Sequence, residues 1–253
     1  MKTLLSLITN RLRRLFGSDV VNVRNMQLPA KYLRLCGTEF EDDEHFIVTA
    51  EAAADRLVED FGLNLRSRIL DVGCGPGRLA IGILNRVGQV QYYHGVDIVR
   101  KRIRWCQRHI ARQHSSFHFT HIDIHNPRYN LGGKPMDADF QFPFSDQQFD
   151  IIYLYSVFSH MVIDEVQAYV REFQRLLTPS GNMFLTAFVE EAVPDITINP
   201  KDYRRTWKGP LHCVRYDINF FEAMLSKHGF KIDYMQRDRS ADGQHCLYIS
   251  RSD

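Results

Sequence analysis

Three glycines at alternating positions stand out in residues 69–80, which read ILDVGCGPGRLA. They follow directly on a short apolar run that ends in Asp71. Glycine adopts positive φ without a steric penalty and lets a ligand approach the backbone closely, and the first turn of a following helix offers free N–H groups. A turn can also need glycine for its geometry alone. The spacing predicts a strand-to-helix turn that can cradle a ligand, formed by Gly73, Gly75 and Gly77.

Two carboxylates follow the next two predicted strands. The strand YYHGVDI ends in Asp97, where a carboxylate can accept hydrogen bonds from both hydroxyls of a ribose. Asp97 can also cap the helix that begins at VRKRIRWCQ, and both roles can hold at once. Asp123 ends the strand in FTHIDIHN, where an acceptor can meet the amino group of an adenine. A glycine turn and two carboxylates on three successive strand ends predict a nucleoside site.

The glycine spacing is G-x-G-x-G. In the dinucleotide fingerprint G-x-G-x-x-G the third glycine lets helix and strand pack closely, and Arg78 stands at that position here. The spacing therefore argues against a nicotinamide-dependent dehydrogenase.

A sheet must position these residues, and the chain from residue 67 onward alternates β-rich runs with helical periodicity. Strands separated by crossover helices lie parallel, and apolar runs such as FDIIYLYSVF suit strands that are buried on both faces. We therefore predict an α/β fold with a doubly wound sheet. The expected strands are 67–72, 91–98, 117–123, 149–158 and 182–189, with helices at 78–87, 99–113 and 163–177.

The two ends of the chain add smaller predicted units. After an irregular stretch, a helix over 218–228 ends at Gly229, and two strands around SADGQ predict a hairpin. A helix over 43–61 predicts a cap above the carboxyl edge of the sheet. The expected organisation is a cationic amphipathic segment 1–20, a helical cap 21–66 and a ligand-binding domain 67–253 with covering segments 124–143 and 190–216.

The charge balance and the cysteines indicate which kinds of partner and site to expect. The chain has 32 Lys and Arg against 30 Asp and Glu, so its net charge does not favour a nucleic acid as the partner. Its five cysteines are widely spaced and include no C-x-x-C pair, which favours reduced thiols in a cytoplasmic protein over disulfides or a metal site. These are Cys36, Cys74, Cys106, Cys213 and Cys246.

The first residues, MKTLLSLITNRLRRLFGSD, alternate apolar and basic side chains like a cationic amphipathic helix. The apolar part is too short for a membrane span and lacks the cleavage pattern of a secretory signal. Two interpretations stay open. The helix packs on its own domain or on a second copy as a homodimer, or it makes a peripheral contact with an anionic membrane surface.

The ordered motifs resemble those of class I S-adenosylmethionine-dependent methyltransferases over residues 67 to about 189. The resemblance rests on ILDVGCGPGRLA, GVDI, HIDI, FPFSDQQFDIIYLYSVFSHM and LLTPSGNMFLTAF. WCQRHI and SVFSHM resemble a bacterial group, many of whose members are assigned to small-molecule or sugar methylation. The resemblance implies a Rossmann-like, seven-stranded sheet, mostly parallel, with an antiparallel last strand. TPSG stands where the family often has P-G-G, a departure that lies beyond the cofactor.

The resemblance also implies S-adenosyl-L-methionine as the cofactor, with S-adenosyl-L-homocysteine as the product, and it implies residue roles by motif position. Four residues would line the methionine end, two the ribose and two the adenine, and one would lie beneath the sulfonium. In that order these are Asp71, Gly73, Gly75 and Gly77; Asp97 and Ile98; Asp123 and Ile124; and Ser156.

His160 is the candidate general base. It lies four residues past Ser156, where the fourth strand gives way to a loop that faces the cofactor. Imidazole has a suitable proton affinity near neutral pH. A histidine that fixes the loop through a local hydrogen bond, or that contacts the cofactor, is the alternative. His125, His212 and His245 are weaker candidates.

The acceptor should be selected by the segments that cover the sheet edge. One of these is rich in cationic and aromatic side chains, which can grip an anionic acceptor or stack on a ring, or simply form a solvated loop. Its members are Lys201, Tyr203, Arg204, Arg205, Trp207, Lys208, Arg215 and Tyr216.

The leading expectation is methyl transfer to a small-molecule acceptor, at a hydroxyl of a sugar or a specialised metabolite. An RNA or protein methyltransferase is the first alternative, opposed by the balanced charge and by YSVF at the end of the fourth strand. A non-catalytic nucleoside-binding interaction protein is the second. The sequence does not identify the acceptor.

Overall fold

The computed structural model describes residues 19–34, 37–137, 139–203, 206–237 and 243–252. The predicted amphipathic segment 1–20 lies outside these residues except for its last two, so its role stays a prediction. No helix in the described ranges has the length and apolar character that a membrane crossing requires.

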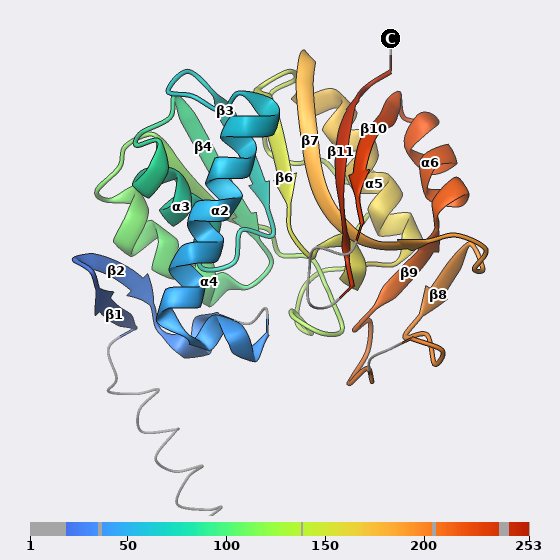
Figure 1. Cartoon of the computed structure of the whole chain (residues 1–253), viewed down its shortest axis with the longest axis horizontal. Helices are drawn as coiled ribbons and strands as arrows, with labels where there is room; N and C mark the ends of the chain where they lie inside the picture. Colours follow the sequence, from blue (N-terminus) through green and yellow to red (C-terminus); the bar gives the residue numbers. More distant parts are fainter. Residues whose placement is uncertain (1–18, 35–36, 138, 204–205, 238–242, 253) are drawn as a thin grey trace, which may run out of the picture.

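A central sheet organises the molecule (Figure 1). Its strand order is β10-β11-β7-β6-β3-β4-β5, and β11 runs antiparallel to both of its neighbours. This confirms the predicted α/β class, the mostly parallel sheet and the C-terminal hairpin. The strands are β3 (Arg68–Val72), β4 (Tyr92–Asp97), β5 (Phe117–His121), β6 (Phe149–Leu154), β7 (Leu177–Glu190), β10 (Phe230–Gln236) and β11 (His245–Arg251).

The sheet has nine strands, where seven were expected. The additional strands are β8 (Ile196–Ile198) and β9 (Val214–Asp217), which lie in or overlap the stretch expected to be irregular. They form because β7 extends beyond the sheet edge, where its last residues pair in parallel with β9. A separate hairpin of β1 (Val20–Val23) and β2 (Met26–Pro29) was also not predicted.

Helices cover both faces of the sheet (Figure 1). One face packs against α2 (Asp43–Phe61), α3 (Arg78–Arg86) and α4 (Arg100–Cys106), and α4 continues as the π-helical turn η3 (Gln107–Ala111). The other face packs against α5 (Ile163–Leu176) and α6 (Ile218–Ser226).

The apolar strands supply both cores at once, because successive side chains point to opposite faces. In β3, Leu70 and Val72 join the core beneath α5, whereas Ile69 joins the core beneath α2 and α3. β6 divides in the same way, with Ile152 on one side and Tyr153 on the other. This explains the apolar runs without alternation that the sequence shows.

Helix α2 has the predicted bounds but a different position. It packs on the face of the sheet against α3, so closely that a Cβ at Gly82 would lie 1.9 Å from the backbone oxygen of Ala50. The expectation that it covers the carboxyl edge is therefore wrong. Among the described residues of this N-terminal region, Gly37 and the first residues of the turn η2 (Thr38–Glu41) reach the cavity at that edge.

Candidate active site

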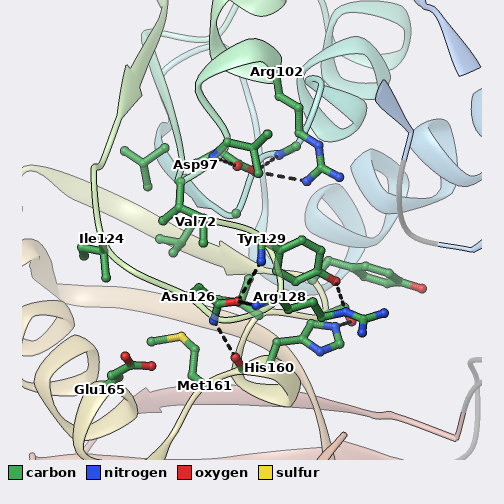
Figure 2. Close-up of a pocket in the computed structure, with 18 of the residues that line it drawn as sticks. Val72, Asp97, Arg102, Ile124, Asn126, Arg128, Tyr129, His160, Met161 and Glu165 are labelled. Atoms are coloured by element: carbon green, nitrogen blue, oxygen red, sulfur yellow. Dashed lines mark hydrogen bonds and ion pairs between the residues drawn. The ribbon is translucent and has the colours of Figure 1, made fainter. Parts of the chain in front are cut away.

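A cavity of about 560 Å³ opens at the carboxyl ends of β3, β4, β5 and β6 (Figure 2). This volume lies within the range of small-molecule and cofactor sites. Seven of the predicted site residues line it together. They are Gly73, Gly75, Asp97, Ile98, Ile124, Ser156 and His160.

The glycine turn has the backbone geometry that its sequence predicts. Gly73, Gly75 and Gly77 have φ values of 71°, 56° and 82°, which L side chains adopt only with strain. A Cβ at Gly73 would lie 2.6 Å from Val157, and one at Gly77 would lie 2.6 Å from Ile110. A Cβ at Gly75 would meet no described atom within 4 Å. Gly75 therefore leaves open space on the cavity side, whereas Gly77 serves packing and lies outside the lining.

The carboxylate of Asp97 connects the glycine turn to the start of α4. Its Oδ2 accepts from the Gly75 backbone N–H at 2.9 Å, and its Oδ1 accepts from the Val99 N–H at 2.6 Å. Arg102 Nη1 lies 3.8 Å from Oδ2. Asp97 thus holds the backbone that precedes α4 while its side chain lines the cavity, so the structural role and a ligand role are compatible.

Asp71 lies behind the glycine turn, in a second and much smaller cavity, not among the lining residues of the large one. Its carboxylate is buried and accepts a hydrogen bond from the Tyr93 hydroxyl. Burial raises the pKa of Asp71 to about 7, against the opposing effects of the Tyr93 hydrogen bond and the Arg78 charge. This side chain therefore supports the turn from below.

Asp71→Asn is expected to gain stability relative to the wild type as pH rises. Between the ordinary pKa of 3.8 and about 7, the folded protein keeps a proton that the unfolded chain has lost, so wild-type stability falls over this window. At 1.36 kcal/mol per unit, the change approaches about 4 kcal/mol. Urea unfolding at pH 4.5 and pH 8 measures it, with the exposed Asp123→Asn as control. A difference that does not vary with pH would contradict the assignment.

The two residues assigned to adenine lie differently. Ile124 is buried and lines the cavity, as does Ile98 from the preceding strand end. Asp123 lies at the same edge, since Asp97 pairs with His121 in the β4–β5 register. However, its side chain is exposed, accepts from Asn130 Nδ2 at 3.3 Å and is not among the lining residues. Its role toward adenine stays a prediction.

Ser156 follows β6 with φ at 57°, a strained conformation for a residue other than glycine. A buried network holds it there. Its backbone N–H donates to Thr186 Oγ1 at 2.8 Å, and Gln244 Nε2 donates to its hydroxyl at 2.9 Å. Thr186 in turn donates to Gln244 Oε1 at 2.9 Å. Three neighbouring strands, β6, β7 and β11, thus fix this corner of the cavity.

The imidazole of His160 has a defined tautomer. Its Nδ1 lies 2.9 Å from the carbonyl oxygen of Leu211. Because a carbonyl only accepts, this hydrogen bond places the proton on Nδ1 and leaves a lone pair on Nε2. Nε2 lies 3.4 Å from the Ser156 hydroxyl, at the limit of a hydrogen bond. His160 therefore presents a basic nitrogen at the cavity wall.

Covering segment 124–143 holds the backbone at His160. Asn126 is buried and donates from Nδ2 to the His160 carbonyl at 2.9 Å, as Figure 2 shows. Its Oδ1 accepts from the backbone N–H groups of Arg128 and Tyr129. Segment 190–216 supplies the Leu211 carbonyl and segment 124–143 supplies Asn126, so both segments converge on His160.

Sequence reasoning missed several lining residues, because nothing in their local pattern marks them. The most polar are Arg102 on α4, Glu165 on α5 and Gln244 before β11. Burial raises the pKa of Glu165. Aromatic side chains also line the cavity, and these are Tyr129, Tyr155, Tyr169, Phe188 and Trp207, of which Trp207 was named in the sequence analysis.

The basic cluster of segment 190–216 does not gather at the cavity. Arg215 is buried and pairs with Glu190 and Asp202, at 3.2 and 3.1 Å. Arg204 and Arg205 lie outside the described residues. Of its aromatic members, Trp207 lines the cavity and packs against Tyr203 with ring centroids 5.1 Å apart. The segment therefore offers a ring surface, and its described cations give no grip for an anionic acceptor.

The chain is similar to a family of methyltransferase domains and to individual relatives. The family described as methyltransferase domain matches residues 69–181. An O-methyltransferase of Aspergillus nomiae is 26% identical over 202 residues, which cover 76% of this chain and 78% of that protein. An uncharacterised protein of Haemophilus influenzae is 25% identical over 179 residues, 71% of this chain. The match covers 61% of that relative's length, less than two thirds.

Solved structures share the fold. The crystal structure of magnesium protoporphyrin IX methyltransferase from Synechocystis, with bound SAH, matches with a TM-score of 0.57. The match covers 100% of both chains at 18% identity.

The residues at the cavity fit the cofactor of that family. Gly75 leaves the backbone accessible, Asp97 offers a buried acceptor for ribose hydroxyls, and Ile98 with Ile124 gives an apolar surface for a purine. The order of these features along the sheet edge follows the strand order β3, β4, β5. The region that carries these features, residues 69–181, is similar to the methyltransferase domain, and its cavity fits the cofactor of class I S-adenosylmethionine-dependent methyltransferases.

Proposed function

We propose that this enzyme transfers a methyl group from S-adenosylmethionine to a hydroxyl oxygen of a small molecule, a sugar or a specialised metabolite. The observation that carries the proposal is the tautomer of His160, whose unprotonated Nε2 lies at the wall of the cavity. Its similarity to an O-methyltransferase adds support. The wide spacing of the five cysteines, without a C-x-x-C pair, supports a cytoplasmic location.

When bound, the cofactor supplies a methyl group that is already activated by its sulfonium. The protein must therefore position the acceptor and remove its proton. His160 Nε2 accepts the hydroxyl proton as the oxygen attacks. The charge that develops on the imidazole is stabilised by the Leu211 carbonyl, which accepts from Nδ1. Ser156 and its network keep the loop beneath the reacting atoms in place.

The contact between the covering segments supports a small-molecule acceptor. Arg128 Nη1 donates to the Lys208 carbonyl at 3.0 Å and thereby joins segment 124–143 to segment 190–216. Phe188 and Trp207 pack against each other beside this contact, with centroids 5.6 Å apart. An acceptor would lie between these rings and His160. This arrangement favours a ring-containing molecule over a long polymer.

Two measurements test the proposal. Calorimetry with S-adenosylmethionine and S-adenosylhomocysteine should give binding to one site. Release of S-adenosylhomocysteine should then be measured over a panel of sugars, phenols, amines and thiols, and we expect turnover with hydroxyl compounds. Turnover only with amines, thiols, RNA or protein would show that the acceptor is not a hydroxyl of a small molecule. No binding of either nucleoside would overturn the proposal as a whole.

A further inference from the structure

Arg102 is a buried cation at the cavity whose hydrogen bonding is incomplete. It lies in the first turn of α4, its side chain is 8% exposed, and it lines the same cavity as Asp97. Its Nε and Nη2 are buried and have no hydrogen-bond partner among the described residues. Figure 2 shows Arg102 beside Asp97, above the ring of Tyr129.

Such an arrangement is unfavourable in the protein alone. An arginine stays protonated, and a buried N–H group without an acceptor loses its hydration with nothing in return. Asp97 compensates the charge only in part, because Nη1 and Oδ2 are 3.8 Å apart and Oδ2 already accepts from Gly75. The Tyr129 ring, at 5.9 Å, offers a weak cation–π contact. These donors are therefore available to a ligand in the cavity.

The pair of side chains specifies the chemistry of that ligand. Asp97 and Arg102 together are neutral, so they do not call for a second anion. The carboxylate can only accept hydrogen bonds and the guanidinium can only donate them. A hydroxyl does both. Two neighbouring hydroxyls can donate to Asp97 and accept from Arg102, which satisfies every group, so the pair is complementary to a vicinal diol.

We propose that Arg102 donates hydrogen bonds to the ribose hydroxyl oxygens of the bound cofactor, while Asp97 accepts hydrogen bonds from the same hydroxyls. This inference rests on the proposed cofactor. It makes Arg102 a specificity residue that reads the ribose diol from the side of α4. It also explains why Arg102 is buried, whereas Arg100 and Lys101 in the same turn are exposed.

A double-mutant cycle between protein and ligand tests the inference. The dissociation constants of S-adenosylhomocysteine and its 2′-deoxy and 3′-deoxy analogues are measured for the wild type and Arg102→Met. We expect Arg102→Met to bind S-adenosylhomocysteine about tenfold more weakly. In the wild type, at least one deoxy analogue should bind about tenfold or more weakly than S-adenosylhomocysteine. In the variant, removal of the same hydroxyl should weaken binding about threefold or less.

Two further variants make each outcome decisive. Arg104→Met removes an exposed arginine from the same helix and should leave all affinities unchanged. Arg102→Leu also removes the donors and the charge, and it replaces the methionine variant if that one unfolds, as thermal denaturation will show. Equal deoxy penalties in wild type and variant would overturn the inference, as would a change confined to the acceptor KM. Failure of the wild type to bind S-adenosylhomocysteine would instead overturn the proposed function.

Discussion

His160→Ala is expected to lower kcat about 10² to 10³-fold, whereas the affinity for S-adenosylmethionine stays within about threefold of the wild type. The loss follows because the Leu211 contact occupies Nδ1 and so leaves the lone pair of Nε2 to accept the proton of the acceptor. The wild-type rate should also rise with pH as the imidazole loses its proton, and the variant should lose this limb of the profile. Release of S-adenosylhomocysteine, with the acceptor found in the panel, measures both effects.

A second substitution separates a base from a structural histidine. The amide of His160→Gln can still donate a hydrogen bond to the Leu211 carbonyl, but it cannot take up a proton at neutral pH. If kcat recovers in His160→Gln, the role of His160 is to hold the loop, and the base assignment is wrong. His228→Gln, just beyond α6 and outside the cavity lining, is the control and should have wild-type kcat.

The base is tied to the segments that cover the acceptor. Leu211 holds its ring and Asn126 holds its backbone carbonyl, and Arg128 joins the two segments that carry them. Leu211 itself has φ at 43°, so its carbonyl direction depends on the packing of the surrounding segment. The tautomer of His160 therefore depends on the same segments that enclose the acceptor.

The elements were predictable where their signal is local. Helix α2 has the predicted bounds, because Asp42 caps its first turn and Gly62 ends it in the left-handed conformation. The parallel strands were predictable from their apolar runs and from the helices between them. Strands β8 and β9 were not, because they form through pairing with the end of β7 and have no strong pattern of their own.

Some residues of the site were likewise predictable from the local sequence and others were not. The strand-end residues were predictable because parallel strands bring their carboxyl ends to one edge of the sheet. At this edge the Gly75 N–H donates a hydrogen bond to the Asp97 carboxylate. Arg102 and Gln244 were not, because their role depends on burial beside residues that are distant in sequence. Asp71 looked like its neighbours in the motif, yet the strand alternation turns it to the smaller cavity.

Asp97→Ala is expected to weaken binding of S-adenosylmethionine and S-adenosylhomocysteine about 100-fold or more. Each hydrogen bond from a ribose hydroxyl to a carboxylate contributes about 1.5 to 3 kcal/mol, and a factor of ten corresponds to 1.4 kcal/mol. The substitution also removes the acceptor of the Gly75 N–H, so the glycine turn loses its anchor. Titration calorimetry measures the affinity, and thermal denaturation reports whether the fold is kept.

Asp97→Asn disturbs the glycine turn less than Asp97→Ala, because the amide keeps one oxygen for the Gly75 N–H while it removes the charge and the acceptor of the Val99 N–H. We expect it to bind about tenfold more weakly than the wild type. The double variant Asp97→Asn/Arg102→Met removes both buried charges and should be more stable than Asp97→Asn alone, because no unpaired cation stays buried. Asp123→Ala, on the exposed side chain at the same edge, is the comparison. If Asp97→Asn binds both nucleosides with wild-type affinity in a folded protein, the carboxylate serves only the turn and α4, and the ribose lies elsewhere.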